Sequence, residues 1–166
     1  MENALHLATE WLLRASCEVG QDYFQLPVAG LEEPQYRERV YCYELYHRWR
    51  THWARHFPFS LAGEIDKQRH PLIRNLTKPD FLVHIPGQMM NLLIVEVKPG
   101  NRDIAEMMKD LRTLTAFRRE FGVGKNYDAA YFWIYGLDSD GWNALRGYPE
   151  SSLLKSSAAS FTSGSG

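Results

Sequence analysis

The sequence has few cysteines, no long apolar run and almost no net charge, and each shortage excludes a class of protein. Cys17 and Cys42 are its two cysteines and form no CxxC or Cys/His pattern, so neither a disulfide framework nor a zinc site is indicated. We expect both to be small buried hydrophobic residues. The apolar runs are strand-sized, too short to span a membrane. The first residues, MENALHLATEWLLRAS, include an early glutamate and no cleavage-type apolar segment, so we expect no signal peptide and a cytoplasmic protein.

The formal net charge of −1 argues against a protein that coats nucleic acid through bulk electrostatics. Basic residues nevertheless gather locally. The stretch 35–56 contains two glutamates and five arginines, namely Arg37, Arg39, Arg48, Arg50 and Arg55. A second group lies in a loop-like stretch, comprising Lys67, Arg69, His70, Arg74 and Lys78. Such groups either contact phosphates or form a solvated surface, and the sequence leaves both interpretations open.

Hydrophobic periodicity predicts a mixed α/β domain. The predicted helices are 3–18, 35–56, 101–121 and a short one from Asp138 or Ser139 to Leu145, and the predicted strands are 59–65, 81–85, 91–98 and 127–135. Strands 91–98 and 127–135 flank a helix, which predicts a parallel pair. The aromatic side chains of 127–135 are expected in the core. Residues 151–166 are rich in serine and glycine and predict a flexible tail after a single domain, 1–150.

The strand LLIVEVKPG, residues 92–100, contains two charges within a buried-type apolar run. Burying Glu96 and Lys98 is costly unless the charges are paired or bind a metal. Residues two apart on a strand point to the same face, so both side chains can serve one site. An incidental ion pair on an exposed sheet face is the alternative.

Asp80 is the third candidate for this site. Fifteen residues lie between Asp80 and Glu96, a spacing that fits strand 81–85, a turn at Pro86-Gly87 and the returning strand. An antiparallel hairpin of this length brings Asp80 beside Glu96 and Lys98. Two carboxylates provide the hard oxygen ligands that Mg²⁺ prefers. Lys98 is no ligand while protonated, but it can neutralise charge on a phosphoryl oxygen or acidify a bound water.

Residues 78–100, KPDFLVHIPGQMMNLLIVEVKPG, resemble the core of the PD-(D/E)xK nuclease superfamily. Asp80 matches the first acid of its motif, Glu96 the second acid and Lys98 the lysine. The superfamily often has a further glutamate on a preceding helix, and Glu44, in YELYH, is the best match. Glu64, in GEIDK, is a second candidate. The likeness covers residues 36–135 in the order of elements, and four or five positions in motif.

The resemblance implies a restriction-endonuclease-like fold, a mixed sheet of about four strands flanked by helices. It also implies Mg²⁺-dependent hydrolysis of DNA, with RNA not excluded and Mn²⁺ able to substitute. Asp80, Glu96 and the Val97 carbonyl would hold the metal, Lys98 would orient the attacking water, and Glu44 or Glu64 would complete the shell or reach a second metal. Lys109 or Arg112 would touch a phosphate. Members commonly act in restriction, repair or phage defence.

Three alternatives remain at the sequence level. The chain could be a catalytically silent version of this fold that binds nucleic acid or protein. It could be an unrelated α/β domain with an incidental ion pair. Glu44, on an aromatic helix face, could simply bond neighbouring Tyr or His side chains. If the chain is a nuclease, its small size suggests that a homodimer or a partner subunit helps to grip a duplex.

Overall fold

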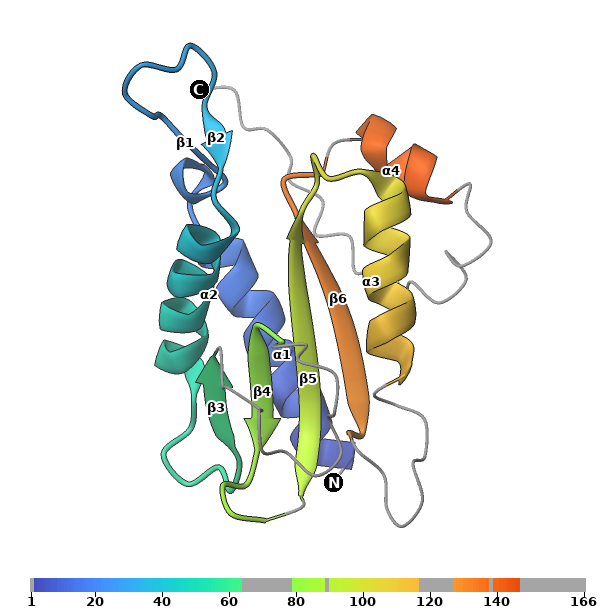
Figure 1. Ribbon diagram of the computed structural model, residues 1–166. Coiled ribbons are helices and arrows are strands. Elements are labelled where there is room, and N and C mark those ends of the chain that lie inside the picture. Colours follow the sequence, from blue (N-terminus) through green and yellow to red (C-terminus); the bar gives the residue numbers. More distant parts are fainter. Residues whose placement is uncertain (1, 64–78, 89, 117–126, 138, 147–166) are drawn as a thin grey trace.

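The computed structural model describes residues 2–63, 79–88, 90–116, 127–137 and 139–146 (Figure 1). Its order of elements confirms a mixed α/β protein. The helices are α1 (Glu2–Glu18), a short 3₁₀ turn η1 (Gln21–Tyr23), α2 (Glu38–His52), α3 (Ile104–Ala116) and α4 (Ser139–Arg146). The strands are β1 (Gln25–Leu26), β2 (Gln35–Tyr36), β3 (Ser60–Gly63), β4 (Phe81–His84), β5 (Asn91–Pro99) and β6 (Ala129–Tyr135).

The main sheet has the order β3-β4-β5-β6. β4 pairs antiparallel with both β3 and β5, whereas β5 and β6 run parallel, with α3 as the crossover between them. The predicted hairpin and the predicted parallel pair are therefore both confirmed. β5 is the longest strand and lies between two neighbours, which explains its near-continuous apolar sequence.

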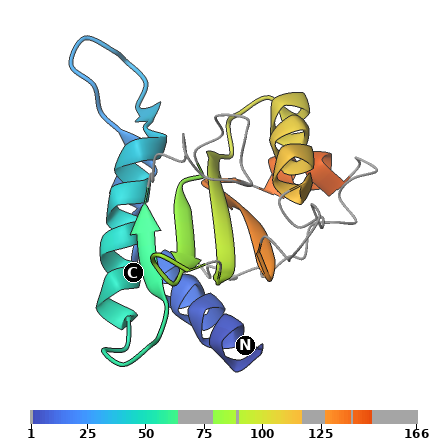
Figure 2. The ribbon, with the colours of Figure 1, turned by 60° about the horizontal axis from the view of Figure 1, so that its bottom comes forward.

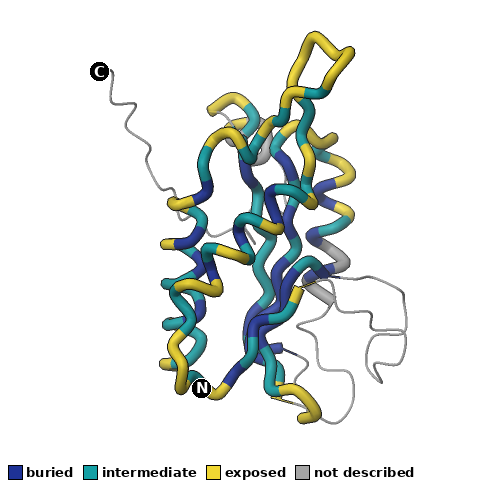
Figure 3. Tube along the Cα trace, turned by 90° about the vertical axis from the view of Figure 1, so that its left-hand side faces the viewer, coloured by how far each residue is buried: buried dark blue, intermediate teal, exposed yellow. Residues whose placement is uncertain are grey.

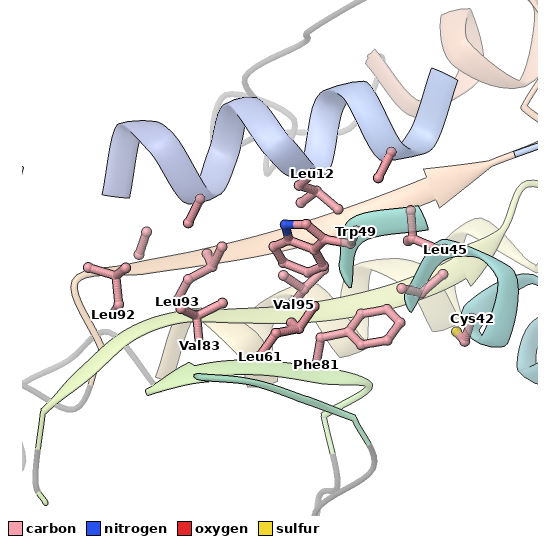
Figure 4. Close-up of a cluster of buried hydrophobic side chains, with 14 of the residues drawn as sticks. Leu12, Cys42, Leu45, Trp49, Leu61, Phe81, Val83, Leu92, Leu93 and Val95 are labelled. Atoms are coloured by element: carbon pink, nitrogen blue, oxygen red, sulfur yellow. The ribbon is translucent and has the colours of Figure 1, made fainter. Parts of the chain in front are cut away.

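Helices cover both faces of the sheet, as expected (Figure 2). Leu93 and Val95 pack with Leu12 of α1 and Trp49 of α2, as Figure 4 shows for the large cluster on that face. Ile94, between them in sequence, packs on the other face with Leu114 of α3. This alternation is the period of two that a strand imposes, and it directs Glu96 and Lys98 to the face covered by α3.

The aromatic residues of the last strand belong to the core, as predicted. The Tyr135 ring stacks on the Tyr41 ring of α2 at 3.8 Å, and Trp133 Nε1 donates a hydrogen bond to the Tyr41 hydroxyl at 3.1 Å. Tyr127 and Tyr135 are buried, and Tyr131 and Trp133 are half-buried against the large cluster. These contacts fix α2 against the end of β6.

Two helix starts differ from the prediction. Gln35 and Tyr36, predicted as the start of a helix, instead pair with Leu26 and Gln25 in a small hairpin that projects from the body (Figures 1 and 3). α2 therefore begins at Glu38. α3 begins at Ile104 rather than near 101, because Asp103 Oδ1 accepts hydrogen bonds from the N–H groups of Ala105 and Glu106 and so caps the helix.

The prediction for the cysteines is half correct, because Cys42 is buried and Cys17 is exposed. Residues 64–65 and 117–121, predicted as ends of elements, lie outside the described residues, as does the predicted tail. Within the described ranges, no helix combines the length and the apolar composition needed to cross a membrane.

The packing of α1 on the sheet predicts unequal effects of truncating leucines. Leu12 belongs to α1 and is fully buried, whereas Leu31, in the hairpin loop, is 53% exposed. We expect Leu12→Ala to lower the free energy of unfolding by about 2–5 kcal/mol, because a cavity is left in the core. Leu31→Ala should change it by less than about 0.5 kcal/mol. Urea unfolding measures both, and equal losses would contradict the described packing.

Candidate functional site

Glu96 and Lys98 form an ion pair near the carboxyl end of β5. Lys98 Nζ lies 2.8 Å from Glu96 Oε1, and the two side chains are only 15% and 14% exposed. They leave the sheet on the α3 face, beyond the buried pair Leu82–Ile94. The pair is therefore largely removed from water, unlike an ordinary surface ion pair.

Asp80 precedes β4 and joins this site through the strand register. Phe81 pairs with Val95 and Leu82 with Ile94, so one further step places Asp80 opposite Glu96 on the same face. Asp80 Oδ2 accepts a hydrogen bond from the Val97 N–H at 2.6 Å. The carboxylate thus occupies the place that a β4 carbonyl would otherwise fill in the ladder.

Pro79 explains why the ladder ends at this point. Continuing the register by two steps from Phe81 places Pro79 opposite Val97, and proline has no N–H to donate to the Val97 carbonyl. A strand residue directs its N–H and C=O toward the same neighbouring strand. Because the Val97 N–H faces Asp80, the Val97 carbonyl is directed to the Asp80 side as well.

A second acid, from α2, also lies in contact range of Lys98. Glu38 Oε2, from the first turn of α2, lies 3.5 Å from Lys98 Nζ. That oxygen is buried and has no hydrogen-bond partner within the part of the chain that the structure describes. The ammonium is therefore in contact range of both carboxylates, and Glu38 Oε2 is able to accept a further hydrogen bond.

The electrostatic balance of the site is negative. Burial raises the pKa of Asp80 to about 7, and the charge of Glu96 adds to this, whereas the Val97 N–H and Lys98 oppose it. Three carboxylates, those of Glu38, Asp80 and Glu96, meet one ammonium. This excess of negative charge adds to the effect of burial in making ionisation of Asp80 unfavourable, and a cation would relieve it.

The pKa values of both partners of the ion pair, Glu96 and Lys98, are raised. Burial raises the pKa of Glu96, against the hydrogen bond and charge of Lys98, and Asp110 of α3 raises it further. Burial alone would lower the pKa of Lys98, but the hydrogen bond and charge of Glu96, with the charges of Glu38 and Asp80, raise it above its ordinary value. Lys98 therefore remains protonated at neutral pH.

The structure brings together three of the predicted site residues, Asp80, Glu96 and Lys98, and directs the Val97 carbonyl toward them. It places Glu44 elsewhere: Glu44 Oε1 accepts a hydrogen bond from Arg48 Nε at 2.6 Å. Six residues separate Glu44 from Glu38, which turns it about 120° away around the helix. Its role in the site remains a prediction.

Three further residues were predicted to contact a metal or a phosphate, namely Glu64, Lys109 and Arg112. Glu64 lies outside the described residues. Lys109 is exposed on α3, and the side chain of Arg112 is not among those described.

Two acids of the site, Glu38 and Asp110, were not predicted. Glu38 precedes buried Cys42 and Leu45 by four and seven residues, the spacing that puts all three on the sheet-facing side of α2. The sequence alone did not show which side of this mixed helix is buried, so Glu38 was one charge among several. Asp110 lies between the buried Met107 and Leu111 of α3, a position that the stripe of apolar residues alone could not assign to the site.

The donor set suits a hard divalent cation. Asp80, Glu96 and the Val97 carbonyl offer oxygen atoms from one edge of the sheet, and Glu38 Oε2 is a buried oxygen without a hydrogen-bond partner among the described residues. Across the described ranges, no three His, Cys, Asp or Glu side chains form a ready-made metal cluster. A cation would therefore depend on two carboxylates, the backbone oxygen and water.

None of the family models, curated proteins or solved structures compared with the chain matches it.

The raised pKa of Asp80 predicts a pH-dependent effect of Asp80→Asn on stability. The folded pKa of about 7 exceeds the ordinary 3.8, so the fold loses stability as pH rises from about 4 to about 7, the range in which Asp80 is ionised in the unfolded chain but not in the folded one. The amide oxygen of asparagine can still accept the Val97 N–H. In EDTA at about pH 8, we expect the variant to be more stable by about 1–2 kcal/mol, with the gain shrinking as pH falls to about 4.

Urea unfolding at several pH values measures this difference. Asp128→Asn, at a half-buried position outside the site, is the control and should change stability little at any pH. A gain for Asp80→Asn that is independent of pH would contradict the electrostatic origin.

Proposed function

We propose that the protein is a metal-dependent nuclease of the PD-(D/E)xK type, which hydrolyses phosphodiester bonds in DNA with Mg²⁺. The observation that carries this proposal is the convergence of Asp80, Glu96 and Lys98 where β4 begins beside β5. The mixed four-stranded sheet with helices on both faces is compatible with a restriction-endonuclease-like fold. Metal binding would explain why a core strand contains a charged pair, because a buried acid can bind a cation.

Asp80, Glu96 and the Val97 carbonyl would hold the metal ion. A divalent ion held there would lower the pKa of a water molecule and offset charge on the phosphate. Two features of the site favour metal binding. Its excess of negative charge attracts a cation, and Pro79 has no N–H that could donate a hydrogen bond to the Val97 carbonyl. Mn²⁺ has similar ligand preferences and is expected to substitute.

Lys98 supplies the positive charge of the site. Its ammonium has three donors, of which one is bonded to Glu96, and it remains protonated because acids lie on both sides of it. A phosphate oxygen or the attacking water could accept another of these hydrogen bonds. Such a charge-assisted bond strengthens as negative charge develops on the phosphorus oxygens, which lowers the barrier.

Glu38 is the helix glutamate of this proposal. It lies on α2, the helix before the core strands, and its buried Oε2 lies close to Lys98. It either holds Lys98 in place or accepts a ligand of its own. Glu44 is the competing candidate from the sequence, and Glu64 remains a third.

The proposed chemistry predicts that conservative changes in the pair abolish cleavage without unfolding the protein. Glu96→Gln and Lys98→Met should each lower the rate of DNA cleavage by about 100-fold or more, because one removes a ligand and the other a charge. Cleavage of linear, circular and single-stranded DNA, and of RNA, is measured in Mg²⁺, Mn²⁺ and EDTA, with thermal unfolding as the check on folding. Equal products with and without EDTA would exclude the mechanism, and a protein that binds but never cuts would be the silent form.

The two glutamates of α2 predict different outcomes. Glu38→Gln should lower the cleavage rate by about tenfold or more, since Glu38 is in contact range of Lys98. Glu44→Gln should leave the rate within about threefold, because Glu44 is paired with Arg48 and contacts no residue of the site among the described contacts. The reverse result would show that Glu44, and not Glu38, is the helix glutamate that acts in cleavage.

A further inference from the structure

The outer side of α2 carries a stripe of cationic and aromatic side chains. Arg39, Tyr43, His47 and Arg50 follow one another at intervals of four, four and three residues, which places them on one side of the helix. All four are exposed. α2 forms one flank of the molecule, with its other side on the sheet (Figures 1 and 2), so this outer stripe faces solvent.

Tyr43 is unusual within the outer stripe. Its side chain is 62% exposed. Among the described residues, two other large hydrophobic residues are exposed, Leu31 and Met90. The other two lie in the hairpin loop and the β4–β5 turn, whereas Tyr43 projects from the middle of a rigid helix. A fixed ring among cations is suited to stacking against a flat ligand that carries negative charge.

The acids of α2 are directed away from the outer stripe. Glu38 faces Lys98, and Glu44 is bonded to Arg48 on another side of the helix. The outer stripe itself contains no acid, although the chain as a whole is slightly acidic. Its charge is therefore complementary to a polyanion.

We infer that the outer stripe of α2 binds single-stranded DNA and delivers it to the site at Asp80, Glu96 and Lys98. The inference rests on the proposed nuclease function and narrows its substrate. Single strands offer phosphates and unstacked base faces together, whereas a duplex hides its base faces. Arg39 and Arg50 lie about 16 Å apart along the helix, a span of several phosphates. Arg39 directly follows Glu38, so the first turn of α2 carries both an end of the stripe and a residue of the site, on different sides of the helix.

The test measures binding of a labelled single-stranded thymidine oligonucleotide by fluorescence anisotropy, in EDTA so that no metal-dependent cleavage occurs. Tyr43→Ala should weaken binding about tenfold, because a stacked base is lost, whereas Tyr43→Phe should retain the wild-type affinity. The pair Arg39→Gln/Arg50→Gln should reduce the slope of log affinity against log salt by about 1.4, the share of two phosphate contacts to a single strand. Arg14→Gln and Leu31→Ala, exposed changes elsewhere, are the controls and should change neither.

Three results would overturn the inference: no single-strand binding at low salt, equal losses in Tyr43→Phe and Tyr43→Ala, or a preference for duplex that Tyr43→Ala leaves unchanged. Failure of the proposed function is a separate result. A protein that binds through the outer stripe yet cuts nothing in Mg²⁺ would contradict the nuclease activity and support the surface. A protein whose stripe variants bind and cut normally, while Lys98→Met is inactive, would support the nuclease activity and overturn the surface.

Discussion

The hydrogen bond from the Val97 N–H to the Asp80 carboxylate is the interaction on which the site depends. It ends the β4–β5 ladder with a charged side chain in place of a backbone carbonyl, and it fixes that side chain beside Glu96. Pro79 makes the arrangement stable, since a residue with an N–H could extend the ladder past this point. The edge so created has carboxylates and a carbonyl available for a ligand, although the strand around it is closely packed.

The excess of negative charge at this edge lowers the stability of the fold. Neighbouring groups offset only part of this loss. Lys98 compensates one of these charges and is in contact range of two acids, Glu96 on its own strand and Glu38 on α2. The pKa of Asp80 is raised because burial and Glu96 together outweigh the bond from Val97 and the charge of Lys98. A folded chain tolerates such an arrangement most readily where a ligand supplies the missing positive charge.

The strand pattern predicted most of the sheet, because alternation, the Pro-Gly turn and the helix between β5 and β6 are all local signals. The approach of Asp80 to Glu96 followed from hairpin geometry. Glu38 could not be assigned, because α2 has polar and apolar residues on several sides, and only packing shows that the side with Cys42, Leu45 and Trp49 is the buried one. Asp110 depends on how α3 is rotated against the sheet, a result of packing by Met107, Met108 and Leu111 that no local pattern specifies.

The site draws its charged groups from positions between 38 and 110, and the strand that carries two of them pairs in parallel with residues up to 135. The β4–β5 hairpin alone holds Asp80, Glu96 and Lys98, whereas Glu38 and Asp110 join from α2 and α3. During synthesis, the full set of carboxylates is therefore complete only once α3 has been made. By then α1, α2 and the strands β3 to β5, which supply most of the large hydrophobic cluster, are available to oppose the repulsion among them.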